Sequence, residues 1–330
     1  MTRHVVLLTY GEPPTPAFLP QLRYSWRILL GLTRSVAPIP LALIPMIAVM
    51  RGRARWRLWT EEKYGSPLEP LTREQAVGLQ ALLNRREGAE RWRVHLGYEF
   101  RDPLLLDRLA MLPPDDPVDV VPMYVADSAF THQLARDTIA RWTARAAKRS
   151  GPIRIRPALD ESAVIAASVA HVRREIAARG AGGPGWALVL AAHGTLLEPQ
   201  KPIETGRIAT ERIAAGIAER LRDRFDRIQL GWLNHVYGGR WTEPAADVAL
   251  RELSQSGVKK VVYFPFGFLA DNAESELEGR VALRAVPEME AFHLPCLNTA
   301  AELIGAIADQ LTGSAATTAP TPEPAGRISG

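Results

Sequence analysis

Cysteine is almost absent from this chain of 330 residues, which limits how the chain is stabilised and what it binds. The single cysteine, Cys296, cannot form a disulfide within the chain. One thiol also cannot supply all the ligands of an iron–sulfur cluster or a zinc knuckle. The composition therefore fits a reducing compartment.

The sequence also lacks an apolar run long enough to cross a membrane. The most apolar stretch, residues 38–50, is shorter than the roughly 20 residues that a bilayer requires and is interrupted by three prolines. The opening residues, MTRHVVLLTYGEP, have too short an apolar run for a signal peptide and no small-residue cleavage site. We therefore expect a cytoplasmic protein.

Neither sign of charge dominates. Lysine and arginine total 40 against 36 aspartates and glutamates, for a net charge of +4. This mild bias permits an anionic ligand or a membrane surface and does not demand nucleic acid. No P-loop and no GxGxxG motif is present, so no strand–helix turn carries a nucleotide fingerprint. With 47% apolar residues the chain can bury a sizeable core, and its length favours two domains.

What the sequence does contain is an alternation of strand and helix patterns. Continuous apolar runs typical of buried strands occupy residues 4–9 and 186–192. Further strand patterns occupy residues 92–97, 118–124, 227–233 and 258–266. Helical patterns lie between or after them, at residues 73–84, 129–147, 161–179, 207–224 and 244–256. This alternation predicts an α/β fold with parallel sheets and right-handed crossovers.

The two halves of the chain resemble each other in outline. Each opens with a strand that ends in an aromatic residue or histidine followed by glycine, at Tyr10 and His193. We therefore predict two α/β lobes of the same type, an N-terminal one over residues 1–150 and a C-terminal one over 151–312. The tail, residues 313–330, is rich in proline, alanine and threonine and is predicted to be disordered.

Polar side chains follow several predicted strands, at the edge where open parallel sheets bind ligands. They are Tyr10, Ser128, His193, Asn234, His235, Asp271 and Glu274. His193 ends the apolar strand WALVLAA, and an imidazole there can bind a metal ion or accept a proton near neutral pH. The competing interpretation is a histidine whose hydrogen bonds merely close the end of a strand.

An acidic segment, DNAESELE, follows the last predicted strand. Asp271 is placed to cap a helix, and Glu274 and Glu278 are four residues apart and share one helical face. Such a line of carboxylates can carry protons or a divalent cation. The competing interpretation is a solvated acidic face near the positive end of the helix dipole.

A basic run follows the apolar stretch at residues 38–50. Four arginines alternate with glycine, alanine and tryptophan at positions 51, 53, 55 and 57. Such a run suits nucleic-acid phosphates, an anionic membrane surface, or simply the solvated end of an amphipathic helix.

Taken together, the motifs resemble those of the ferrochelatase family, in order, over about residues 3–312. The most specific is GSPLEPLTREQ at residues 65–75. The others are VVLLTYGEP, VPMYVADSAFT, LVLAAHG, GWLNHVYGGRWTEP and GVKKVVYFPFGFLADNAESELE.

The resemblance implies two Rossmann-like lobes with a porphyrin cleft between them. It implies insertion of the substrate Fe²⁺ into a porphyrin with release of two protons and without a redox cofactor. His193 would be the base or a metal ligand, and Glu274 a second catalytic and metal-binding residue opposite or beside it. Asp271 and Glu278 would form a path for protons or metal.

The resemblance also implies a set of ring contacts and a membrane contact. Porphyrin would be bound by Tyr10, Ser66, Ser128, Trp241 and Phe268. Residues 38–50 would form an apolar lip of the cleft, and residues 38–57 a possible peripheral contact with the inner membrane. No nucleic-acid partner is implied.

Four departures from the family pattern affect substrate contacts and the proton route. LLEPQKPIETG replaces a GDPY segment, and Asn272 stands where the family has histidine. Leu233-Asn234 replaces a Gln-Ser pair, and Glu99-Phe100 replaces an Arg-Tyr pair.

The substrate is open between two porphyrins. Tyr10 matches the form of the family that handles coproporphyrin III, whereas the apolar lip and WTEEKYGSPL resemble enzymes for protoporphyrin IX, which we favour. The sequence is also compatible with a related cobalt or nickel chelatase and with a non-catalytic porphyrin or haem carrier.

Overall fold

The computed structural model describes residues 2–35, 39–88, 90–145, 149–199, 202–234 and 239–313. The predicted disordered tail, apart from Gly313, lies outside these residues, as do Pro38 and His235.

The N-terminal half is built on a parallel sheet with strand order β2-β1-β3-β4. Its strands are β1 (Arg3–Thr9), β2 (Trp92–Tyr98), β3 (Val118–Pro122) and β4 (Ile153–Ile155). Because side chains alternate along a strand, Val5 and Leu7 of β1 pack on the side of α3 (Leu68–Glu87), whereas Val6 and Leu8 face the opposite core. That second core includes α4 (Leu105–Met111) and α5 (His132–Arg145). Burial on both faces explains the continuous apolar run of β1.

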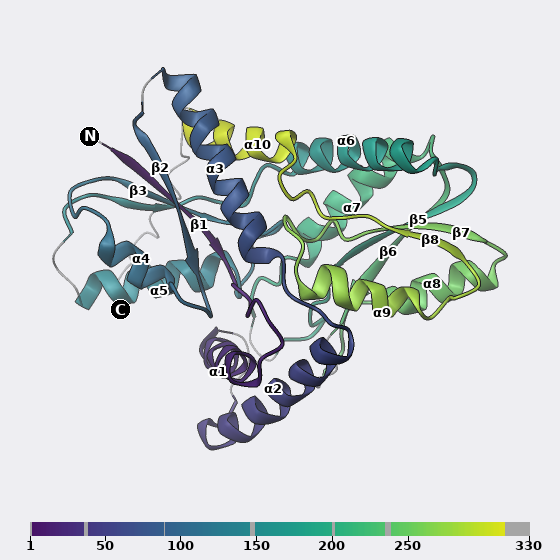
Figure 1. The fold of residues 1–330 in the computed structure, drawn as a ribbon, viewed down its shortest axis with the longest axis horizontal. Coiled ribbons are helices and arrows are strands. Elements are labelled where there is room, and N and C mark those ends of the chain that lie inside the picture. Colours follow the sequence, from purple (N-terminus) through teal and green to yellow (C-terminus); the bar gives the residue numbers. More distant parts are fainter. Residues whose placement is uncertain are drawn as a thin grey trace, which may run out of the picture.

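The C-terminal half repeats this plan with the order β6-β5-β7-β8, again all parallel. Its strands are β5 (Gly183–His193), β6 (Phe225–Leu233), β7 (Lys260–Phe264) and β8 (Glu290–His293). The helices of this half are α6 (Glu161–Arg179), α7 (Arg207–Leu221), α8 (Ala246–Gln255), α9 (Gly279–Leu283) and α10 (Ala301–Thr312) (Figure 1). The predicted α/β class with two parallel sheets is confirmed.

The strand pairing bears on where the halves divide. β4 pairs with β3, with Ile153 opposite Val118, so the strand that completes the first sheet follows residue 150. The division into domains at residue 150 stays a prediction. α10, at the other end of the sequence, packs against both α3 and α6 (Figure 1).

A helical hairpin is inserted between β1 and α3. It consists of α1 (Phe18–Ser35), a short 3₁₀ turn η1 (Leu41–Leu43) and α2 (Ile44–Glu61). The two helices pack on each other and lie to one side of both sheets, below them in Figure 1. The described part of the predicted lip is thus Ile39 and Pro40, η1 and the first turns of α2, and the alternating arginines lie on α2.

Hydrogen bonds join the two halves near the carboxyl ends of their strands. The buried amide of Gln75 on α3 donates to the carbonyl oxygens of Leu269 at 3.1 Å and Asn298 at 2.7 Å. The N–H of Ala129 donates to the carbonyl of Glu204 at 2.8 Å. The carboxyl edges of the two sheets are therefore held close to each other, which is where ligands of such folds bind.

Candidate functional site

The two residues that the sequence singled out for chemistry are in contact. His193 is the last residue of β5, and Glu274 lies in η2 (Ala273–Glu278), a turn of π-helix that follows β7. The Nδ1 atom of His193 and the Oε1 atom of Glu274 are hydrogen-bonded. The His193 side chain is 42% exposed and that of Glu274 is 18% exposed, so this pair borders solvent.

The electrostatics of this pair favour a bound proton. Burial by itself lowers the pKa of His193, but the charge of Glu274, its hydrogen bond to the ring and the charge of Glu278 together raise that pKa above its ordinary value. Burial and the charge of Glu274 raise the pKa of Glu278 well above that of an exposed glutamate. Glu278, with a pKa of about 8, therefore titrates near neutral pH, and the imidazolium of His193 is favoured over the neutral ring.

The residue that caps η2 is Asn272 and not Asp271, so the sequence-based prediction of Asp271 as the cap is wrong. The Asn272 side-chain oxygen accepts the N–H groups of Glu274 at 2.9 Å and Ser275 at 3.1 Å, and Ser275 Oγ accepts the Asn272 N–H at 2.9 Å. The cap must lie directly before the first residue of the turn for its short side chain to reach these donors, and Asp271 lies one residue too early.

Asp271 has a different position. It is buried, and its two carboxylate oxygens accept the Cys296 N–H and the Asn298 side-chain N–H, both at 2.7 Å. These bonds hold the segment after β8 against the start of η2. Asp271 therefore fixes the backbone that carries Glu274.

Glu12 is a buried carboxylate that the sequence analysis missed. Its Oε2 accepts the Ser66 hydroxyl at 2.7 Å and the Ala273 N–H at 3.0 Å, and an Arg55 nitrogen lies 3.6 Å from Oε1. Glu12 thus joins the end of β1, α2, the loop before α3 and the first residue of η2. Its position two residues after Tyr10 is the available sequence signal, because it also follows a buried strand.

Tyr10 lies in an aromatic cluster at the carboxyl end of the first sheet. Its ring centroid is 5.6 Å from Phe100, 4.8 Å from Tyr124 and 5.5 Å from Phe130, and its hydroxyl donates to the Phe130 carbonyl at 3.2 Å. Burial and the charges of Glu274 and Glu99 raise the pKa of Tyr10 well above its ordinary value. Glu274, the residue bonded to His193, is thus one of the charges that act on Tyr10.

Glu99 is the unusual member of this region. Its Oε1 atom is buried and has no hydrogen-bond partner within the described residues, and burial raises the pKa of its carboxyl from 4.5 to about 8. The hydroxyl of the neighbouring Tyr124 is also buried without a partner there. Glu99 is therefore a neutral carboxyl at moderate pH, where the family pattern has an arginine.

The remaining predicted ring contacts lie on loops. Ser66 is buried and held by Glu12. Ser128 closes its own turn, with its Oγ 3.0 Å from Thr131 Oγ1. Trp241 forms an isolated bridge with Leu196, and Phe268 packs partly on the core of the second sheet. That these residues contact a porphyrin ring stays a prediction.

Two features are absent from the described residues: a cluster of metal ligands and a membrane-spanning helix. No group of three or more histidine, cysteine or acidic residues that could hold a metal ion occurs among them. In the same ranges, no helix combines the length and the hydropathy needed to span a bilayer.

Comparisons with solved structures define the class of fold. CbiX, described as the terminal enzyme for biosynthesis of siroheme in denitrifying bacteria, superposes with a TM-score of 0.53 at 17% identity, over 96% of this chain and 100% of its own. SirB from Bacillus subtilis gives a TM-score of 0.50 at 12% identity, over 94% of each chain. At these identities the likeness shows a shared fold.

Sequence comparison identifies the family. Curated proteins named ferrochelatase include one from Azoarcus sp., 28% identical over 92% of this chain and 85% of its own length. Another, from Dechloromonas aromatica, is 26% identical over 93% of this chain and 86% of its own. The sequence model of the family described as Ferrochelatase matches residues 3–314, and the chain belongs to that family.

Proposed function

We propose that this protein inserts Fe²⁺ into a porphyrin, releases two protons, and acts on protoporphyrin IX in haem biosynthesis. The observation that carries the proposal is the His193–Glu274 pair at the carboxyl end of the central strand β5, in a chain of the ferrochelatase family. Fe²⁺ is a substrate, and because the reaction changes no oxidation state it needs no redox cofactor.

His193 is the group that we assign to the first proton. Glu274 binds Nδ1, so a neutral imidazole carries its hydrogen there and its lone pair on Nε2. That lone pair accepts a pyrrole proton from the macrocycle, and the adjacent carboxylate stabilises the imidazolium that forms. The raised pKa of His193 is the expected consequence of this pairing. The same nitrogen, or a Glu274 oxygen, can ligate the metal ion before the porphyrin nitrogens replace it.

Glu274 and Glu278 are the groups that we assign to onward proton transfer. They lie four residues apart in η2, and burial, followed by the charge of Glu274, raises the pKa of Glu278. A carboxyl with a raised pKa takes and releases protons near neutral pH. Asp271, which the sequence placed on the same path, is committed to hydrogen bonds with Cys296 and Asn298, and we assign it to positioning η2.

The surroundings of Tyr10 support protoporphyrin IX over coproporphyrin III. A phenolate ligand to iron requires a tyrosine that loses its proton, whereas burial and two nearby carboxylates raise the pKa of Tyr10. Its hydroxyl also donates to a carbonyl within its own cluster. Tyr10 is thus suited to packing against an apolar ring, together with Trp241, Phe268 and Ser128, while Ser66 acts through Glu12.

The helical hairpin supports peripheral membrane contact by a cytoplasmic protein. Large apolar side chains of α1, η1 and α2 are 37–71% exposed, and they are Phe18, Leu19, Trp26, Leu41, Leu43, Met46, Val49, Met50 and Trp56. Arg23, Arg53 and Arg57 on the same two helices are exposed as well. Apolar side chains flanked by arginines suit an anionic membrane surface, and binding that weakens with salt to vesicles containing anionic lipid tests this.

Anaerobic incubation with Fe²⁺ and each porphyrin separately, followed by absorbance, tests the function. We expect faster consumption of protoporphyrin IX than of coproporphyrin III. Parallel reactions with Co²⁺ and Ni²⁺ separate a ferrochelatase from a chelatase for those metals. Tight porphyrin binding without any insertion would identify a carrier and reject the proposal.

A further inference from the structure

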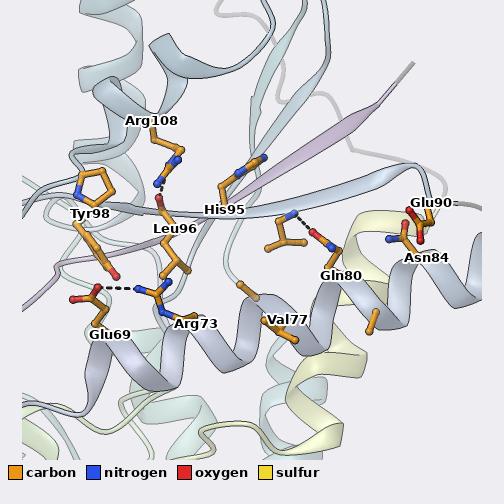
Figure 2. A pocket seen from close by; sticks show the side chains of 14 residues that line it. Glu69, Arg73, Val77, Gln80, Asn84, Glu90, His95, Leu96, Tyr98 and Arg108 are labelled. Carbon is orange, nitrogen blue, oxygen red and sulfur yellow. Dashed lines mark hydrogen bonds and ion pairs between the residues drawn. The ribbon is translucent and has the colours of Figure 1, made fainter.

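A groove outside the His193 region lies along the free edge of the first sheet. Its volume is about 560 Å³, and α3 on one side and the segment from Pro103 to α4 on the other form its walls (Figure 2). The floor is β2, the edge strand of that sheet, with Val94, His95 and Leu96.

The hydrogen-bond pattern of β2 fixes which backbone groups face this groove. The Arg91 carbonyl accepts the Arg3 N–H, and the Glu99 N–H donates to Thr9, so odd-numbered residues of this strand pair with β1. The N–H and carbonyl groups of residues 92, 94, 96 and 98 therefore point outward. An unprotected row of this kind is a template for another chain.

Most of these outward groups already have partners from the same protein. Asn84 binds both the N–H and the carbonyl of Trp92, at 2.9 and 3.3 Å. The Gln80 side chain accepts the Val94 N–H, and Arg108 Nε donates to the Leu96 carbonyl, both at 3.0 Å (Figure 2). The Tyr98 N–H donates to the Pro103 carbonyl at 3.0 Å.

Three outward groups remain: the Tyr98 carbonyl, in the parallel bridge of Tyr98 with Leu104, and two groups that lie on either side of His95. Within the described ranges, no hydrogen bond reaches the Val94 carbonyl or the Leu96 N–H. This pattern matches one residue of an extended chain that runs parallel to β2. The N–H of that residue donates to the Val94 carbonyl, and its carbonyl accepts the Leu96 N–H. In an antiparallel pairing, a bound residue would need both the N–H and the carbonyl of a single β2 residue. Gln80 already binds the Val94 N–H and Arg108 already binds the Leu96 carbonyl, so neither residue offers both groups. Only a single residue running in the direction of β2 can pair here.

That direction places the carboxyl end of the bound residue near Tyr98. Arg73 and Arg108 line the groove at this end, together with the carboxylate of Glu69. Glu69 pairs with Arg73 and with Arg101, which lies 5.9 Å from the Tyr98 ring centroid. The terminal nitrogens of Arg108 have no partner in the part of the chain that the structure describes. Tyr98 is 1% exposed, its hydroxyl is likewise without a partner there, and it points toward Glu69 and Arg73 in Figure 2.

We propose that this groove binds the carboxyl-terminal residue of an extended peptide from a partner protein. The Val94 carbonyl accepts the N–H of that residue, and the Leu96 N–H and Arg108 bind one or both carboxylate oxygens. The Tyr98 hydroxyl and Arg73 complete the site. The chain must end here because the next outward groups, the Leu96 carbonyl and the Tyr98 N–H, are already occupied. A main-chain pairing with a charged terminus is a known mode of peptide capture.

Fluorescence anisotropy with three pools of labelled tetrapeptides, randomised in sequence, tests the proposal. One pool has a free carboxylate, the second a carboxamide, and the third a free carboxylate with an N-methylated last residue. We expect saturable binding of the first pool below about 1 mM and at least about 10-fold weaker binding of the other two. Tyr98→Phe and Arg73→Gln are each expected to weaken the first pool about 5-fold or more, because each removes one carboxylate contact.

Arg85→Gln, an exposed residue of α3 outside the groove, is the matched control and should bind as the wild type does. Tyr98→Phe removes only an unpartnered hydroxyl, so its melting temperature should not fall. Equal binding of the three pools, no saturable binding, or wild-type affinity in both groove variants would overturn the proposal. Metal insertion by these variants is expected to be unchanged, so the outcome is independent of the proposed enzymatic function.

Discussion

Glu99, a half-buried residue whose Oε1 atom is fully buried, makes a quantitative prediction about pH and stability. In the unfolded chain this group ionises near 4.5, and in the folded protein burial raises its pKa to about 8. The difference corresponds, at 1.36 kcal/mol for each pKa unit, to about 5 kcal/mol. Between these two pKa values the folded state binds the proton more tightly than the unfolded state.

Proton linkage gives the direction in which the free energy of unfolding changes with pH. The contribution of Glu99 to stability is fully present below pH 4.5 and is lost as the pH rises to about 8, at roughly 1.4 kcal/mol per pH unit. Glu99→Gln keeps the shape and cannot ionise. The variant should therefore match the wild type near pH 4.5 and exceed its free energy of unfolding by about 5 kcal/mol at pH 9.

Urea unfolding at pH 5, 6, 7, 8 and 9, followed by tryptophan fluorescence, measures this difference. Glu74→Gln, on the exposed side of α3, is the control, and its difference from the wild type should not vary in the same way. A constant difference between Glu99→Gln and the wild type across this range would refute the reasoning.

Further predictions concern the site itself. Glu274→Gln should fold and lose about 100-fold or more in turnover, whereas Glu278→Gln should lose less and mainly in apparent metal affinity; full activity with a lowered melting temperature in Glu274→Gln would contradict its catalytic role. Glu12→Ala should lower the free energy of unfolding in urea by about 3 to 5 kcal/mol, because the Ser66 hydroxyl and the Ala273 N–H lose their buried acceptor. Glu12→Gln can keep both hydrogen bonds and should lose less. Equal losses in the two variants would contradict the network. Tyr10→Phe should leave the absorption spectrum of the iron-loaded complex unchanged, and loss of a phenolate band in that variant would instead favour coproporphyrin III.

The sequence predicted the central strands and their helices well. β1 and β5 are buried on both faces, so they carry unbroken apolar runs that stand out from their surroundings. β4 and β8 were not predicted, because they have only three and four residues, lie at sheet edges and are partly exposed. Short edge strands depend on pairing with a neighbour more than on their own pattern.

The nearness of two candidate site residues was predictable from one rule. His193 and Glu274 are far apart in sequence, yet His193 ends one strand and Glu274 follows another strand of the same parallel sheet, so both lie at the same edge. The cap of η2 was misassigned because Asp271 and Asn272 are both good caps, and a shift of one residue cannot be resolved from composition. The buried bonds of Glu12 to Ser66 and Ala273 depend on tertiary contacts that no local pattern encodes.

The most direct test of the central claim is metal insertion by the wild type and His193→Ala, measured anaerobically with Fe²⁺ and protoporphyrin IX. We predict that the wild type converts the porphyrin to its iron complex, and that His193→Ala binds the porphyrin with similar affinity but does not insert the metal, because it lacks the proton acceptor paired with Glu274. Insertion by His193→Ala at the wild-type rate would contradict the account.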